Sequence, residues 1–202
     1  MKKASSGYAR SAEANYKKKK YMASFLKEKY NKEVIAKLKE KFGAKNAMAV
    51  PKILKVSLNS GIGKYLKEKD AIDEIAENLK KISGQKPVFA KSKKSVAGFK
   101  VREGQEVGVS VTLRGERMWH FLERLVSSAL PRVRDFRGID PKNVDRDGNL
   151  NMALKEQFVF PEIVPEGVKT IFSFQVNVTT SAKTKEEGLE LFKLLGFPIK
   201  QD

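Results

Sequence analysis

The chain has 202 residues, of which 41% are hydrophobic, so it is long enough for one domain with a substantial core. It contains no cysteine and one histidine, which excludes a disulfide framework and a thiolate metal site and fits a reducing cytoplasm. Lysine and arginine number 41 against 24 acids, and the formal net charge of +17 is typical of proteins that bind nucleic acid.

The first 20 residues, MKKASSGYARSAEANYKKKK, carry seven basic side chains and one acid, Glu13. Their apolar content is too low for independent folding, so we predict a flexible basic arm. A solvated extension of the following helix is the alternative. No hydrophobic stretch follows the basic residues, and no apolar run in the chain approaches the roughly 20 residues of a membrane span, so we expect no membrane partner. The remainder, residues 21–202, is predicted to form a single domain.

Residues 21–43 show apolar side chains at helical spacing, which predicts a helix that ends near Gly43. The predicted apolar face comprises Phe25, Leu26, Tyr30, Val34, Leu38 and Phe42. Beyond Pro51 the period changes to two, which predicts a half-buried strand. Its inward side chains would be Leu54, Val56 and Leu58.

Helical periodicity returns over residues 70–83, where Asp70 is the expected cap and Gly84 the expected end. The segment from residue 99 to 115, FKVREGQEVGVSVTLRG, predicts two strands joined at an EGQ turn. In its second half the inward side chains would be Val107, Val109, Val111 and Leu113.

The remaining elements are a helix over residues 116–130, an exposed loop over 135–152, a short strand within 153–160, a strand over 171–180 and a helix over 183–195. This order of helices and strands predicts an α+β domain. We expect a mostly antiparallel sheet with helices packed on one face, preceded by the basic N-terminal arm.

Three of the predicted strands bury apolar side chains on one side and present Ser, Thr, Asn, Gln and Gly on the other. Short neutral donors and acceptors suit docking on phosphates and ribose hydroxyls. β-propensity alone accounts for the same pattern, because Ser and Thr are common in strands. Both interpretations remain open at this level.

Patterns for catalysis are incomplete. The segment SGIGK lacks the Walker pattern, because Leu58 stands where glycine is required and Tyr65 where serine or threonine is required. The segment DRDGNLNMALKE resembles a calcium loop, but its glycine, Gly148, comes two residues early. His120 has no second histidine or cysteine to share a metal. We therefore expect a binding protein without catalytic residues, cofactor or metal, and not a nuclease or phosphotransferase that uses the aspartates of residues 135–147.

Four blocks resemble the uL5 family, the bacterial large-subunit ribosomal proteins that carry 5S ribosomal RNA. They are SGQKPVFAKSKKSVAGFKVREG, VTLRGERMWHFLERL, PRVRDFRG and EQFVFPEI, and the resemblance runs from about Phe25 to the C-terminus. It implies a structural protein of the central protuberance of the ribosome. The implied partners are 5S and large-subunit ribosomal RNA, peptidyl-site transfer RNA, a small-subunit head protein and neighbouring 5S-binding ribosomal proteins. A free-standing regulatory RNA-binding protein is the alternative.

The resemblance also assigns roles to residues. The 5S RNA-binding residues would be Asn59, Gln85, Thr112 and Arg114. The loop that approaches transfer RNA would comprise Lys91, Lys93, Lys94, Ser95, Val96, Ala97 and Gly98. The intersubunit bridge would use Asp145, Arg146, Asp147 and Asn149. Phe99 is expected to anchor the transfer RNA loop in the core rather than to stack on a base, because buried Phe is common.

Two features depart from the family. Ala90 stands where a threonine is usual, so the hydrogen bond of that hydroxyl is missing. The N-terminal arm has no counterpart, and we expect it to contact ribosomal RNA phosphates. Its phosphate-binding side chains would be Arg10, Lys17, Lys18, Lys19 and Lys20.

Overall fold

The computed structural model describes residues 24–43, 46–66, 68–164 and 168–200. The predicted arm, with Arg10 and Lys17 to Lys20, lies outside these residues. The α-helices are α2 (Phe25–Lys29), α3 (Ile35–Phe42), α4 (Lys69–Ser83), α5 (Gly115–Arg124) and α6 (Lys185–Leu195). The strands are β1 (Ile53–Gly61), β2 (Val88–Lys91), β3 (Glu106–Leu113), β4 (Leu150–Leu154) and β5 (Phe174–Thr180).

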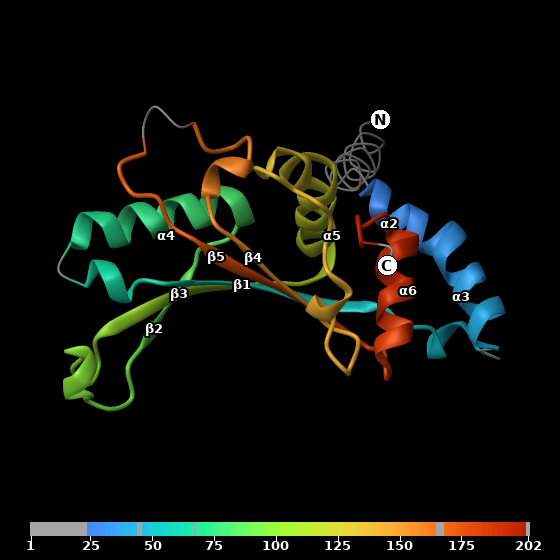
Figure 1. The fold of residues 1–202 in the computed structure, drawn as a ribbon, viewed down its shortest axis with the longest axis horizontal. Helices are drawn as coiled ribbons and strands as arrows, with labels where there is room; N and C mark the ends of the chain where they lie inside the picture. Colours follow the sequence, from blue (N-terminus) through green and yellow to red (C-terminus); the bar gives the residue numbers. More distant parts are fainter. Residues whose placement is uncertain (1–23, 44–45, 67, 165–167, 201–202) are drawn as a thin grey trace, which may run out of the picture.

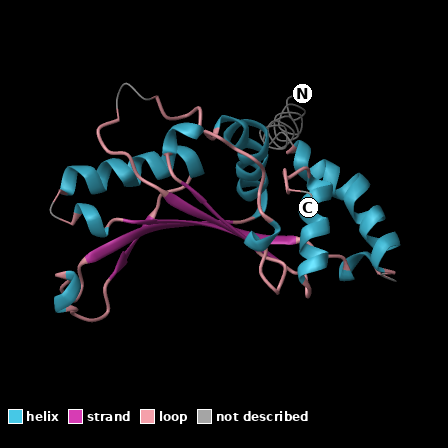
Figure 2. Cartoon of the chain, in the orientation of Figure 1, coloured by secondary structure: helices cyan, strands magenta, loops and turns pink. Residues whose placement is uncertain are grey.

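The five strands form one antiparallel sheet in the order β2-β3-β1-β5-β4. Figure 1 shows α4 and α5 on one face of this sheet, with α2, α3 and α6 grouped at one end. The opposite face of the sheet carries no layer of α-helices within the described residues (Figure 2). The predicted α+β class, with helices on one face of an antiparallel sheet, is confirmed. Among the described residues, no helix combines the length and the apolar character needed to cross a bilayer.

The first predicted helix is interrupted by a π-helical turn, Tyr30–Val34. Its buried side chains follow a strict four-residue step: Leu26, Tyr30, Val34 and Leu38. In an α-helix, four residues rotate about 40° beyond one full turn, so side chains at this spacing would gradually move around the helix. A π-helical turn contains more residues, which keeps these side chains on one face. The prediction was wrong for Phe25, which is 70% exposed because it lies beside this stripe. Phe42 continues the stripe but is the last residue of α3, and it is 36% exposed.

Strand β1 contains an irregularity that the sequence pattern did not predict. The register with β5 shifts between Ile53 and Lys55. An extra residue in one strand reverses the alternation of faces. Ile53 is therefore buried and Leu54 is 44% exposed, the opposite of the prediction for Leu54, whereas Val56 and Leu58 are buried as predicted.

The hairpin before α5 pairs different residues from those predicted. The partner of β3 is β2, which begins at Val88, and not the segment that starts at Phe99. Phe99 lies in a short 3-10 helix, Ala97–Phe99, at the tip of the connection. A four-residue strand without alternating burial offers no period-two signal, so only its pairing with β3 defines it.

The segment predicted as an exposed loop is partly buried and contains a strand. Ile139 and Val144 are 3% and 2% exposed. Strand β4 begins at Leu150, inside this segment, and ends at Leu154, so the strand predicted within residues 153–160 lies earlier than expected. The cap of α4 also differs, because Glu68 precedes the helix and Asp70 lies in its first turn.

Candidate RNA-binding surfaces

Side chains that point away from the core, most of them neutral and polar, form two rows across the sheet. Because α4 and α5 cover the buried face of the sheet (Figure 1), these rows lie on the opposite face. The first row consists of cross-strand neighbours from four strands: Thr112, Ser57, Asn177 and Asn151. The second row runs across all five strands and is polar at its three central positions: Val88, Ser110, Asn59, Gln175 and Ala153. Neighbouring strands lie about 4.8 Å apart, so each row is a ladder of hydrogen-bonding groups at that spacing.

The opposite face of the same strands is mostly apolar, although Ser60 and Thr180 are also buried there. Val56, Leu58, Val109, Val111, Val176 and Val178 are all 0–2% exposed. The core therefore fixes the register of the sheet, because a one-residue slip would bring these side chains to the open face. We call the two rows together the polar face.

Of the four residues expected to bind 5S RNA, Asn59 and Thr112 belong to the polar face, and Gln85 and Arg114 lie next to it. Asn59 and Thr112 lie in adjacent strands and are exposed. The Gln85 side-chain amide donates to the Thr112 carbonyl oxygen at 3.3 Å. Arg114 follows β3 directly and is exposed at the start of α5.

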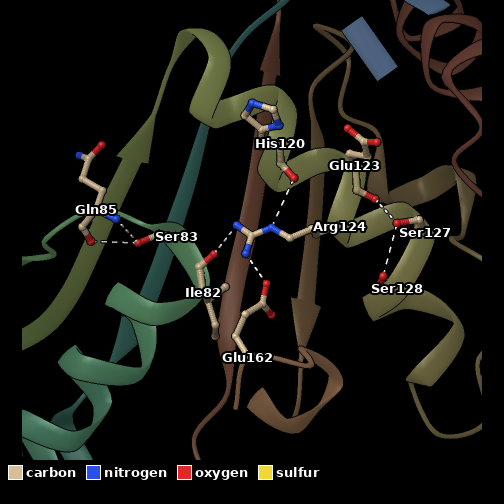
Figure 3. Close-up of polar contacts among 9 residues, drawn as sticks. All are labelled: Ile82, Ser83, Gln85, His120, Glu123, Arg124, Ser127, Ser128 and Glu162. Carbon is tan, nitrogen blue, oxygen red and sulfur yellow. Dashed lines mark hydrogen bonds and ion pairs between the residues drawn. The ribbon is translucent and has the colours of Figure 1, made fainter. Parts of the chain in front are cut away.

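The position of Gln85 is held by a network around Arg124 of α5 (Figure 3). The Arg124 guanidinium donates to the Ile82 carbonyl oxygen at 2.8 Å and pairs with the Glu162 carboxylate. Ser83 exchanges hydrogen bonds with the backbone of Gln85, accepting from its N–H at 3.2 Å and donating to its carbonyl oxygen at 3.0 Å. The end of α4 is thus tied to α5, and Gln85 is aimed at β3.

Sequence reasoning missed part of the polar face. Asn151 was assigned to a loop, although its neighbours Leu150, Met152 and Leu154 are buried in strand alternation. That alternation, LNMAL, is the signal that would have identified β4. Ala90, which replaces the usual threonine, lies near Asn59. A Cβ added at Gly108 would lie 3.8 Å from the Ala90 Cβ and 3.9 Å from the Asn59 Oδ1.

The loop between β2 and β3 protrudes from one end of the sheet (Figure 1). We call residues 91–100 the lysine loop. Backbone hydrogen bonds between Val96 and Val101, at 2.9 and 3.2 Å, close its tip, and Ser95 Oγ donates to the Val101 carbonyl oxygen at 3.2 Å. Its four lysines are exposed: Lys91, Lys93, Lys94 and Lys100. The lysine loop is therefore a basic projection whose conformation is fixed by its own hydrogen bonds.

Phe99 was predicted to anchor the lysine loop in the core, and this prediction was wrong. Its side chain is 78% exposed, and Val96 is 43% exposed. Phe99 is the last residue of a short helical turn, Ala97–Phe99, which is followed by a left-handed Lys100 with φ 55° and contains no buried residue. A Cβ at Gly98 would meet no atom within 4 Å, so the fold itself does not require glycine there.

The residues expected in the intersubunit bridge form a tight turn. Asp145 accepts hydrogen bonds from the Asn149 backbone and side chain, at 2.7 and 3.0 Å. Asn149 in turn accepts from the Thr180 backbone at 2.9 Å. Arg146 and Asp147 are exposed at the tip. Asp145 and Asn149 are half-buried, and their side chains hold the turn.

The sequence matches two family models and several relatives over most of its length. The family model "Ribosomal protein L5" matches residues 46–102, and the model of the C-terminus of the same ribosomal protein family matches residues 106–199. Similar proteins include uL5 of Marinomonas sp. (strain MWYL1), 48% identical over 87% of this chain and 98% of its own length. Those of Colwellia psychrerythraea and Halothermothrix orenii are 48% and 47% identical, over 87% and 88% of this chain and 97% and 99% of their lengths.

Each relative bears the name large ribosomal subunit protein uL5. A sequence identity of 48% over 87% of the chain is far higher than proteins that share only a fold would show. The chain belongs to the uL5 family of large-subunit ribosomal proteins.

Proposed function

We propose that this ribosomal protein binds 5S ribosomal RNA through the polar face. The observation that carries the proposal is the pair of polar rows on a sheet face that no α-helix covers within the described residues. Side chains of Ser, Thr, Asn and Gln both donate and accept, as recognition of ribose 2′-hydroxyls and phosphates requires. Arg114 adds a cation at the edge of this face.

The experiment compares 5S RNA affinity among single variants. Asn59→Ala and Thr112→Ala each remove a partner from a desolvated contact and should weaken binding by roughly 1–3 kcal/mol, about fivefold to 150-fold. Lys91→Ala, on the lysine loop, should change the affinity little. Equal losses from all three variants would contradict the assignment of 5S RNA to the polar face.

The lysine loop is proposed to approach peptidyl-site transfer RNA. Its support is the exposure of Phe99 together with four lysines on a projection closed by its own hydrogen bonds. Lysines bind phosphates, and an exposed aromatic ring offers a platform on which a base can stack. Gly98 leaves the backbone of the tip open to close approach.

The turn at Arg146 and Asp147 is proposed to contact a small-subunit head protein. It lies at the end of the sheet opposite the lysine loop (Figure 1), so both contacts can form together. The double variant Arg146→Glu, Asp147→Lys should weaken subunit association, and unchanged association would remove the turn from the bridge.

The N-terminal arm is proposed to bind large-subunit ribosomal RNA through Arg10 and Lys17 to Lys20. Seven basic residues against one acid support an electrostatic contact. Deletion of residues 1–20 should lower RNA affinity and its salt dependence. Unchanged affinity and subunit assembly would exclude this role.

A further inference from the structure

An apolar cavity of about 400 Å³ lies between the lysine loop and the turn that follows β1. Both segments lie at the end of the sheet from which the lysine loop protrudes (Figure 1). Five of the side chains that line the cavity are apolar: Leu66, Val96, Phe99, Val101 and Val107. Sites for small ligands measure roughly 300–1,000 Å³, so this cavity has room for one compact group of a ligand.

The cavity is an end of the core that the helices leave open. By strand alternation, Val107 faces the same side of β3 as Val109, Val111 and Leu113. Those three residues are at most 2% exposed, whereas Val107 is only half-buried. No described residue of α4 or α5 lines the cavity. Apolar surface is therefore left accessible on the side of the sheet opposite the polar face.

Backbone hydrogen bonds fix both walls of the cavity. On the β1 side, the Ile62 N–H donates to the Val107 carbonyl oxygen at 3.1 Å. At the base of the lysine loop, the Ser92 N–H donates to the Gln105 carbonyl oxygen at 2.8 Å, and the Gly104 N–H donates to the Ser92 carbonyl oxygen at 2.9 Å. The walls are thus in place before a ligand arrives, which lowers the entropic cost of binding.

Basic side chains surround this apolar cavity. Residues 61–66 and 91–107, which supply its lining, carry six basic side chains and two acids, Glu103 and Glu106. All five lysines among them are exposed. The charge favours an anionic ligand, and the lining favours a ligand with an apolar part.

A nucleotide with an unpaired base combines these two parts. Its phosphates suit the lysines, and its base has flat faces that stack on aromatic side chains. The Phe99 ring is 78% exposed and lines the cavity. Ser92 Oγ donates to the Lys94 carbonyl oxygen at 2.7 Å and retains lone pairs that can accept from a base amino group. Bases inside a duplex are stacked, so an unpaired base is required.

We propose that the cavity binds one unpaired nucleobase of RNA, held between Phe99 on one wall and Leu66 on the other. This inference rests on the proposed approach of the lysine loop to transfer RNA and deepens it, because the loop then recognises a base as well as phosphates. The cavity and the polar face lie on opposite sides of the sheet. An RNA on each can therefore be bound at the same time.

The test titrates the full chain, labelled with 13C in its Leu and Val methyl groups, with RNA hairpins at near-physiological salt. Three hairpins share one paired stem: the first carries a bulged adenosine, the second an abasic nucleotide at that position, and the third no bulge. The adenosine hairpin should bind at least fivefold more tightly than the abasic one, which has the same charge. The Leu66 and Val107 methyl resonances should shift only with the adenosine hairpin.

The variant Phe99→Ala should weaken binding of the adenosine hairpin at least fivefold and that of the abasic hairpin less than twofold. Its matched control is Phe25→Ala, because Phe25 is similarly exposed, at 70%, and lies outside the cavity. This control should change both affinities less than twofold. Because both rings are exposed, neither variant should impair folding.

The double variant Lys93→Ala, Lys94→Ala tests the proposed function separately. It should weaken all three hairpins alike, because it removes phosphate contacts and leaves the cavity intact. If it does so while adenosine and abasic hairpins bind equally, the cavity proposal alone fails. If it changes no affinity, the RNA contact of the lysine loop fails as well.

Three other results would overturn the proposal. In the first, only the Val96 and Val101 methyl resonances shift, so the base stacks outside the cavity. In the second, an acidic peptide with one Phe displaces the adenosine hairpin at equal charge concentration, which would make a protein the ligand. In the third, 5S RNA displaces the hairpin and transfer RNA does not, which would break the link to transfer RNA. We expect displacement by transfer RNA and not by 5S RNA.

Discussion

Gly148 should be one of the positions in the described chain least tolerant of a methyl group. It has φ +72°, in the left-handed region that disfavours other residues. A Cβ there would lie 2.6 Å from the Ala182 Cβ and 2.9 Å from the Thr184 carbonyl oxygen, and 3.2 Å from the Gly188 Cα of α6. The turn that carries Arg146 and Asp147 therefore docks on α6 through glycine.

The expected destabilisation of Gly148→Ala has two parts. The left-handed backbone costs about 1–2 kcal/mol, and relief of the contacts costs about 1–3 kcal/mol, because two of the three neighbouring atoms belong to the backbone. Lower entropy of the unfolded variant offsets about 0.4–1 kcal/mol. We therefore expect a net loss of roughly 1–5 kcal/mol in the free energy of unfolding.

Urea denaturation measures this loss, and Gly104→Ala is the matched control. Gly104 has φ +79°, but a Cβ added there would meet no atom within 4 Å. This variant retains the backbone strain and lacks the contacts, so it should lose about 1 kcal/mol or less. Equal losses for the two variants would refute the view that close packing against α6 makes Gly148 necessary.

Three further variants test other parts of the structure. Phe99→Ala should leave the free energy of unfolding within about 0.5 kcal/mol and weaken transfer RNA binding by roughly 1–3 kcal/mol; a large loss in urea denaturation would instead indicate a core anchor. Arg124→Ala removes the bonds to Ile82 and Glu162 and should lower the free energy of unfolding by about 1–2 kcal/mol. The loss should be smaller than for a fully buried ion pair, because the Arg124 side chain is 34% exposed. An unchanged urea midpoint would contradict this prediction. Burial raises the pKa of Tyr30 above its ordinary value of 10.0, so its contribution to stability is complete below pH 10 and declines as pH rises through the folded pKa. Tyr30→Phe should lack this decline, which pH-dependent denaturation of both proteins would detect; parallel curves above pH 10 would refute it.

The helix ends and the central strands could be predicted from the sequence because their signals are local. Gly43, Gly84 and Gly196 each adopt the left-handed conformation just beyond a helix, as their position after an apolar periodic segment indicates. The alternation in β3 and β5 likewise predicted most of their core residues, although Val107 is only half-buried.

The errors arose where tertiary pairing decides the outcome. Leu54 faces solvent because of a register shift against β5, a strand more than 100 residues away. Strand β2 is defined by its pairing with β3, and nothing in VFAK marks it. Phe99 has the composition of a core residue but lies at the tip of a projection.

The residues of the candidate site also fall into those that the sequence predicted and those that only the structure identified. Alternation along each strand placed Asn59 and Thr112 on an outward face, and the structure agrees. The rows that continue to Asn177 and Asn151 depend on the pairing of β5 with β1 and β4. The sequence of one strand does not specify which strands pair with it, so the extent of the polar face could be established only from the strand pairing in the structure.

The central claim is that the polar face recognises 5S ribosomal RNA. The most direct measurement is binding of the purified full chain to 5S RNA at near-physiological salt, in competition with excess transfer RNA and a random RNA duplex. We predict that 5S RNA remains bound while both competitors are present, and that Thr112→Ala loses this selectivity. Equal displacement by the random duplex would contradict the claim and leave only a general electrostatic affinity for RNA.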